Sequence, residues 1–220
     1  MARYFPDFPA FERASKDAKL IPVYRQMMAD HHTPVSAFEL LARQSDHAFL
    51  LESVVGGEKI ARYSFIATSP TVVYQVAHGQ ARIHDFRTGM SREFATADPL
   101  ADLQDMLPRL KYHADPQLPA FTGGLVGFAG YDTVRYYEPE KLNAPPVDDR
   151  NLPDLLFGLY GELVIFDHVD KTIKIIANAD VNAHAGLAEA YADAKRRIDS
   201  IVQSLQRSEE RRVGKECPSL

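Results

Sequence analysis

Cysteine and tryptophan are nearly missing from this sequence. Among its 220 residues there is no tryptophan and one cysteine, Cys217, close to the end of the chain. A single cysteine excludes an internal disulfide and a metal cage built from cysteines. No segment approaches the roughly 20 consecutive apolar residues of a membrane-spanning helix, and residues 1–17 contain no apolar core of signal-peptide length. The sequence therefore predicts a cytoplasmic protein with no membrane segment.

Charge of one sign is not concentrated anywhere either. The chain has 25 Lys and Arg against 30 Asp and Glu, which gives a net charge of -5. Because the two signs are interspersed, no basic stripe indicates nucleic-acid binding and no polybasic cluster indicates a membrane surface. A small anionic or zwitterionic ligand is compatible with this balance. The length and the 45% hydrophobic content suffice for a sizeable core, in one large domain or in part of a two-domain protein.

Hydrophobic periodicity and turn residues predict an α+β fold. Alternating apolar runs follow one another across short turns, which is typical of antiparallel hairpins. Amphipathic segments with helical spacing interrupt the runs, but they do not alternate with them as in a βαβ wind. We therefore expect largely antiparallel sheets with flanking helices. The expected helices cover 9–18, 33–44, 98–112 and 187–205, and the expected strands cover 20–26, 47–53, 60–67, 71–77, 80–86, 90–95, 123–130, 155–168 and 172–179.

Two of the expected helices carry the same start signal. Thr33 and Asp98 are N-cap residues, and each is followed by a proline, whose missing N–H costs nothing at the first helical position. Pro108 is expected to end or kink the helix that starts at Asp98.

Two glycine-rich stretches raise the question of phosphate binding, but neither has the required context. A phosphate loop presents backbone N–H groups at a helix N-terminus. Residues 56–59, GGEK, stand between two strand patterns and so predict a hairpin turn. Residues 123–130, GGLVGFAG, do not match GxGxxG; they predict a strand with closely approaching neighbours, followed by a helix near Tyr131. In that helix Asp132 is the expected cap and Arg135 the expected partner of Glu138.

Histidines give little support for a metal or catalytic site. His31 and His32 adjoin a helix start and lack a second spaced cluster, which favours a solvated loop over metal ligands. His168, in FDHVDK, is expected in a β-turn with Asp167 and Asp170. No serine stands in a GxSxG elbow.

A different kind of candidate follows the apolar run 48–51. This run is suited to burial on both faces, so Glu52 and Ser53 place a carboxylate and a hydroxyl at the edge of a core. Such a rim could bind an amino acid, whose ammonium would meet Glu52 while Arg62 receives its carboxylate. The alternative is that Glu52 and Ser53 only satisfy backbone groups of a turn.

The last residues form a separate segment. Helical periodicity stops at about Gln206, and residues 207–217, RSEERRVGKEC, resemble the translation of a widely used DNA-sequencing adapter. We therefore divide the chain into one domain at 1–206 and a tail at 207–220 that is either artefactual or a genuine disordered segment.

Three ordered motifs carry a family resemblance. LLESVVGGEKIARYSFIATSP, GGLVGFAGYDTVRYYE and DLLFGLYGELVIFDH resemble successive segments of the N-terminal region of anthranilate synthase component I. The likeness covers roughly residues 22–176. Ala61 stands where the family's GRYSF usually has glycine, which is a mild departure.

The resemblance implies an N-terminal domain of the anthranilate synthase component I type and a place in tryptophan biosynthesis. The family's large subunit is a lyase that uses Mg²⁺, chorismate and ammonia to form anthranilate and pyruvate, and a glutamine amidotransferase subunit supplies the ammonia. L-tryptophan inhibits at a feedback site that contains the serine of LLES, here Ser53; Glu52 and Arg62 match neighbouring positions less securely.

The resemblance also implies what this chain lacks. The family's chorismate-binding and Mg²⁺-binding residues lie in the C-terminal half, so the chain alone is expected to be an inactive fragment with no catalytic or metal residue. Two alternatives stay open. One is a fragment of the related aminodeoxychorismate synthase component I of the folate pathway, and the other is a stand-alone amino-acid-binding module.

Overall fold

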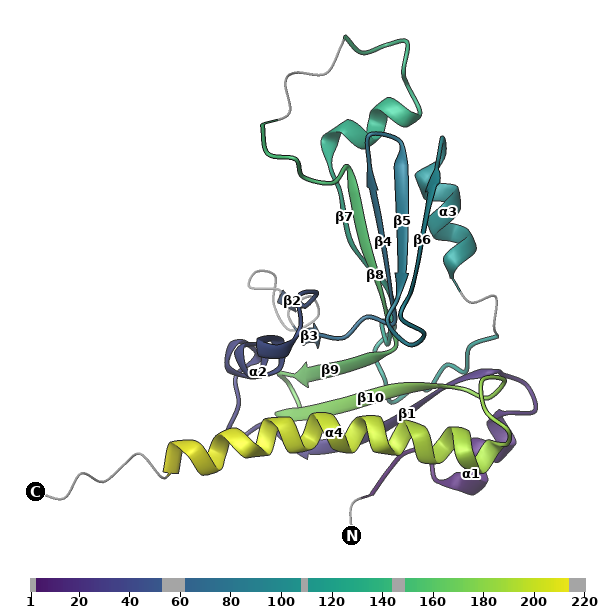
Figure 1. Cartoon of the computed structure of the whole chain (residues 1–220). Helices are drawn as coiled ribbons and strands as arrows, with labels where there is room; N and C mark the ends of the chain where they lie inside the picture. The colour runs from purple at the N-terminus through teal and green to yellow at the C-terminus, as the bar shows by residue number, and fades with distance from the viewer. Residues whose placement is uncertain (1–2, 53–61, 108–110, 144–148, 214–220) are drawn as a thin grey trace, which may run out of the picture. The chain divides into compact units, whose positions relative to one another are not determined.

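The computed structural model describes residues 3–52, 62–107, 111–143 and 149–213. They form two compact units, each with its own antiparallel sheet and helices (Figure 1). Unit 1 combines Met1–Ser69, Leu110–Gly123 and Gly161–Leu220, and unit 2 combines Pro70–Arg109 and Gly124–Tyr160. The α+β class is confirmed, while the region 1–206, expected as one domain, divides between these two units.

Unit 1 is built on a five-stranded sheet in the order β1-β10-β9-β3-β2. All neighbours in this sheet are antiparallel. The central strands are rich in isoleucine and valine, which suits a pleated surface buried on both faces. The strands are β1 Leu20–Met28, β2 Phe49–Glu52, β3 Tyr63–Ala67, β9 Glu162–Asp167 and β10 Thr172–Asp180.

The helices of unit 1 follow from their caps and apolar faces. They are α1 Phe8–Ala14, α2 Pro34–Leu41, the short 3₁₀ segment η1 Ala42–Gln44, and α4 Leu187–Val213. At α2 the predicted cap is confirmed, because the Thr33 hydroxyl accepts from the Ser36 N–H at 3.2 Å and Ser36 returns the contact. Helix α4 lies along β10 and β1 (Figure 1) and buries one face in the core: Ala190, Ala194, Ile198, Val202 and Leu205.

Unit 2 is a second five-stranded antiparallel sheet, in the order β6-β5-β4-β8-β7, with helix α3 and the 3₁₀ segment η2. The hairpin predicted at His78 and Gly79 is confirmed, since both residues have positive φ, 50° and 75°. Its small core gathers around Tyr74 and Leu155. The elements are β4 Val72–Ala77, β5 Gln80–Asp85, β6 Met90–Ala95, α3 Pro99–Met106, β7 Gly124–Ala129, η2 Tyr131–Tyr136 and β8 Leu155–Tyr160.

Several predicted boundaries were wrong. The run 155–168 is two strands in different sheets, β8 and β9, with Gly161 between them. Helix α3 ends at Met106 because Leu107, which precedes Pro108, is extended (ψ 129°), as a residue before proline prefers. Helix α1 starts at the Asp7 cap and ends at Ala14, short of the expected residue 18. Helix α4 continues past 206 to Val213.

Candidate functional site

The β2–β3 hairpin positions two of the three predicted effector-site residues. Glu52 is the last residue of β2, is exposed, and lies opposite Ser64 of β3 in the strand register. Arg62 directly precedes Tyr63, the first residue of β3. Ser53 and the GGEK turn lie outside the described residues, so both stay predictions. The structure thus brings Glu52 and Arg62 to neighbouring segments of one sheet.

Arg62 is held by two aspartates of the turn that follows β9. Its Nε donates to both carboxylate oxygens of Asp167 at 3.1 and 3.2 Å, and its Nη2 donates to Oδ2 at 2.8 Å. The same Nη2 donates to Asp170 at 3.0 Å. The guanidinium also lies 5.1 Å from the centre of the Tyr63 ring. Arg62 is therefore a paired cation, whereas the sequence predicted only a ligand for an effector carboxylate.

Asp167 is buried, with 2% of its surface exposed. Burial alone would raise the pKa of its carboxyl group, but the Arg62 guanidinium and the N–H groups of Asp170 and Val169 outweigh burial and hold that pKa below its usual value. The pKa of Arg62 is raised, chiefly by its hydrogen bonds to Asp167. Both partners are consequently charged at neutral pH.

A second polar pair joins β3 to the turn after β9. The hydroxyl of Ser64, which is fully buried, is 2.7 Å from Nε2 of His168. The predicted β-turn at His168 is confirmed, because Oδ1 of Asp167 accepts from the N–H groups of Val169 and Asp170. No pattern in the sequence indicates the Ser64–His168 contact.

The expected apolar floor is only partly buried. Leu51 is 46% exposed, so the prediction that the run 48–51 is buried on both faces was wrong. β2 is the edge strand of its sheet, which leaves that side chain uncovered. The neighbouring aromatic rings do pack together: Phe65 lies edge-on to Phe121 at 5.4 Å and 6.1 Å from Tyr63.

The backbone conformation requires glycines in the segment GGLVGFAGYD, which runs from Gly123, the last residue of its stretch of unit 1, into unit 2. Gly123 and Gly124 have φ of 148° and 133°, values that a side chain disfavours. At Gly127 an added Cβ would lie 1.9 Å from the Leu156 carbonyl oxygen, so the predicted close approach of neighbouring strands is confirmed. The predicted helix near Tyr131 is the 3₁₀ segment η2, without a side-chain cap, and Arg135 pairs with Asp132 instead of Glu138.

Asp154 links this segment to the β4–β5 turn through hydrogen bonds. Its carboxylate accepts from the Tyr136 hydroxyl at 2.8 Å and from the His78 N–H at 2.9 Å. Its carbonyl oxygen accepts from the N–H of Gly130 and from the Thr133 hydroxyl. Asp154 therefore connects Tyr136 of this motif to the β4–β5 turn within unit 2.

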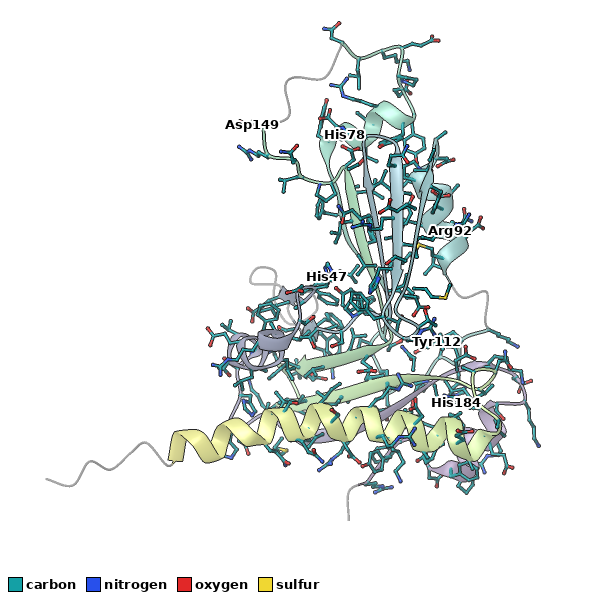
Figure 2. The ribbon with its side chains drawn as sticks, in the orientation of Figure 1. His47, His78, Arg92, Tyr112, Asp149 and His184 are labelled. Carbon is teal, nitrogen blue, oxygen red and sulfur yellow. The ribbon has the colours of Figure 1, made fainter. Side chains whose placement is uncertain are left out.

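Metal-binding side chains are dispersed. His47, His78 and His184, labelled in Figure 2, belong to separate segments. Within the described ranges, no group of three or more His, Cys, Asp or Glu side chains could hold a metal ion. The residues present there do not fit a Mg²⁺ site. Among the same residues, no helix combines the length and apolar character needed to cross a bilayer.

The three sequence motifs fall at the β2–β3 hairpin, at the turn after β9 and in the glycine segment 123–130. The sequence model of the chorismate binding enzyme family matches residues 46–218. The chain belongs to the chorismate binding enzyme family.

Individual relatives share one description. Anthranilate synthase component 1 of Acinetobacter calcoaceticus is 40% identical over 190 residues, which cover 84% of this chain and 37% of the relative. The chloroplastic anthranilate synthase alpha subunit 1 of Oryza sativa subsp. indica is 36% identical over 202 residues, 87% of this chain and 35% of the relative. The crystal structure of anthranilate synthase component I from Streptococcus pneumoniae TIGR4 has a TM-score of 0.52 at 24% identity, covering 82% of this chain and 36% of that one, which supports the fold.

The matched relatives are much longer than the chain. It spans between 34% and 40% of the length of the curated relatives it matches. What those proteins do as a whole therefore does not transfer directly to this part.

Proposed function

We propose that this chain is the N-terminal, effector-binding part of an anthranilate synthase component I. The observation that carries the proposal is the identity of 40% to the Acinetobacter calcoaceticus component over 84% of the chain. In the complete protein, chorismate and ammonia would be converted to anthranilate and pyruvate in the pathway to tryptophan. A glutamine amidotransferase subunit would be the partner, and the cytoplasm the compartment.

The catalytic groups are proposed to lie in the part of the relatives that this chain does not span. The described residues contain no set that fits Mg²⁺, so the requirement for this ion is assigned to that other part. Purified chain incubated with chorismate, Mg²⁺ and ammonium should give no anthranilate fluorescence. Fluorescent product above a protein-free control would contradict this assignment.

The effector site is proposed at the β2–β3 hairpin, with Ser53, Glu52 and Arg62 as its members. Two facts support it: Glu52 is exposed at the end of β2, and Arg62 stands beside the first residue of β3. An exposed carboxylate at the end of one strand and a cation directly before the next strand suit the two charges of an amino acid. L-tryptophan should raise the melting temperature of this chain alone weakly or not at all, because the family places the rest of the pocket in the other half.

Residues 207–220 are proposed to be artefactual. Helix α4 nevertheless continues to Val213, and the family match reaches residue 218. Sequencing the parental DNA around codon 206 tests the idea. A gene that runs on through these codons without adapter bases would contradict it.

A further inference from the structure

The guanidinium of Arg62 is held along one edge only. Nε and Nη2 donate to Asp167, and Nη2 donates to Asp170 as well. Nη1 has no hydrogen-bond or ion-pair partner among the residues that the structure describes. The Arg62 side chain as a whole is 37% exposed.

Asp167 is suited to fixing that edge. Its side chain is 1% exposed, against 56% for Asp170. The N–H groups of Val169 and Asp170 hold its Oδ1 at 3.1 Å, so the carboxylate is itself immobilised by the turn. A guanidinium that donates two bonds to a fixed carboxylate cannot rotate without breaking them. Asp170, which is solvated, contributes far less to such an arrangement.

We propose that Asp167 is a positioning residue, which presents the Nη1 edge of Arg62 to the carboxylate of an amino-acid ligand without touching the ligand itself. The inference deepens the proposed effector site and rests on it. Asp167 is charged at neutral pH because hydrogen bonds outweigh the effect of burial on its pKa. It therefore compensates the charge of Arg62 on the side away from the ligand.

The neighbouring strand supplies the complementary group. Glu52 lies opposite Ser64, and Arg62 stands two residues before Ser64, directly before β3 begins. A ligand that carries both a carboxylate and an ammonium can meet Arg62 and Glu52 together. A ligand without the carboxylate would lose only the contact with Arg62.

The test is a titration of the purified chain with L-tryptophan, followed by NMR of the arginine side-chain N–H signals. Tryptamine, which lacks the carboxylate, is the matched ligand. Asp167→Asn is the matched variant, and Asp170→Asn is the control, because that carboxylate is exposed. Such a titration registers millimolar binding, so weak affinity is sufficient.

We expect L-tryptophan to shift the Nη1 signals of Arg62 in the wild-type chain and in Asp170→Asn. In Asp167→Asn the dissociation constant should rise at least tenfold, while the tryptamine titration is unchanged. Asp167→Glu, which keeps the carboxylate, should recover part of the loss. If Asp167→Asn does not fold, Arg62→Lys replaces it, because lysine keeps the charge but has no second edge. Binding to this variant is followed by the fluorescence of L-tryptophan, since the chain itself contains no tryptophan.

Either of two results with L-tryptophan would overturn the inference. One is that the Nη1 signals of the wild-type chain do not shift, and the other is that Asp167→Asn, or Arg62→Lys where it replaces that variant, binds L-tryptophan as tightly as the wild type. An equal loss of tryptamine binding would also do so, since it would reveal a merely structural role. A failure of the proposed function can be distinguished from a failure of this inference. If the protein of the complete gene makes no anthranilate but Arg62 still responds in an Asp167-dependent way, this inference stands alone.

Discussion

Arg62 and Asp167 are 105 positions apart and meet because β3 and β9 are neighbours, with Tyr63 opposite Asp167. The sequence singled out Arg62 as a cation near Glu52 and read Asp167 only as a turn residue. Nothing local links them, because the contact depends on which strands pair. The pairing was hidden by the crossing of the chain between the two sheets, at residues 69–70 and again at 160–161.

The Asp167 carboxylate should make the free energy of unfolding depend on pH in the acidic range. Its pKa is lowered in the folded chain, so its contribution is fully present above the unfolded value of about 4 and is lost as the pH falls through the folded value. Urea denaturation of the wild type and of Asp167→Asn at pH 7 and at about pH 3 measures this. The wild type should be the more stable at pH 7, and the difference should shrink in acid. A difference that does not change with pH would contradict the assignment.

Gly127 should be intolerant of a side chain. A Cβ would meet the Leu156 carbonyl oxygen at 1.9 Å and the Phe157 Cα at 2.6 Å, and backbone cannot move aside as a side chain can. Gly127→Ala should lower the free energy of unfolding by about 3 kcal/mol or more. Gly161→Ala is the control, because nothing lies within 4 Å of its added Cβ. Equal effects of the two substitutions in urea denaturation would contradict the close approach of β7 and β8.

Among the elements, helices were predicted best where a cap and a proline coincide. Thr33 with Pro34 and Asp98 with Pro99 start α2 and α3, as their local hydrogen bonds dictate. Strand ends were predicted less well, because an apolar run does not show where a chain changes sheet. In 155–168 the only local signs are Gly158 and Gly161, and a glycine within a strand pattern has several meanings: Gly158 lies inside β8, whereas Gly161 marks the change of sheet.

Helix α4 stabilises unit 1 through a single apolar face. Ile198 is fully buried among the core side chains, while Gln203 is exposed on the same helix. Ile198→Ala should cost about 2–5 kcal/mol, through lost burial and the cavity left behind. Gln203→Ala should change stability by about 0.5 kcal/mol or less. Equal urea midpoints for Ile198→Ala and Gln203→Ala would contradict this account.

At the scale of the molecule, the sequence predicted the α+β class and the family, and missed the division into two units. The motifs sufficed for the family, and in one of them the residues meet a backbone need, at Gly124 and Gly127. The division was missed because each unit is assembled from separated segments, such as Leu110–Gly123 in unit 1. Of the residues predicted for the effector site, Glu52 ends β2 and Arg62 directly precedes β3, and the contact between Arg62 and Asp167 emerged only from the structure.

The most direct measurement is anthranilate fluorescence from the protein encoded by the complete parental gene. With chorismate, Mg²⁺ and ammonium it should form anthranilate, L-tryptophan should inhibit the reaction, and Ser53→Ala should relieve that inhibition. Aminodeoxychorismate as the product, or no product at all, would contradict the proposed function. Inhibition that Ser53→Ala leaves unchanged would remove Ser53 from the effector site.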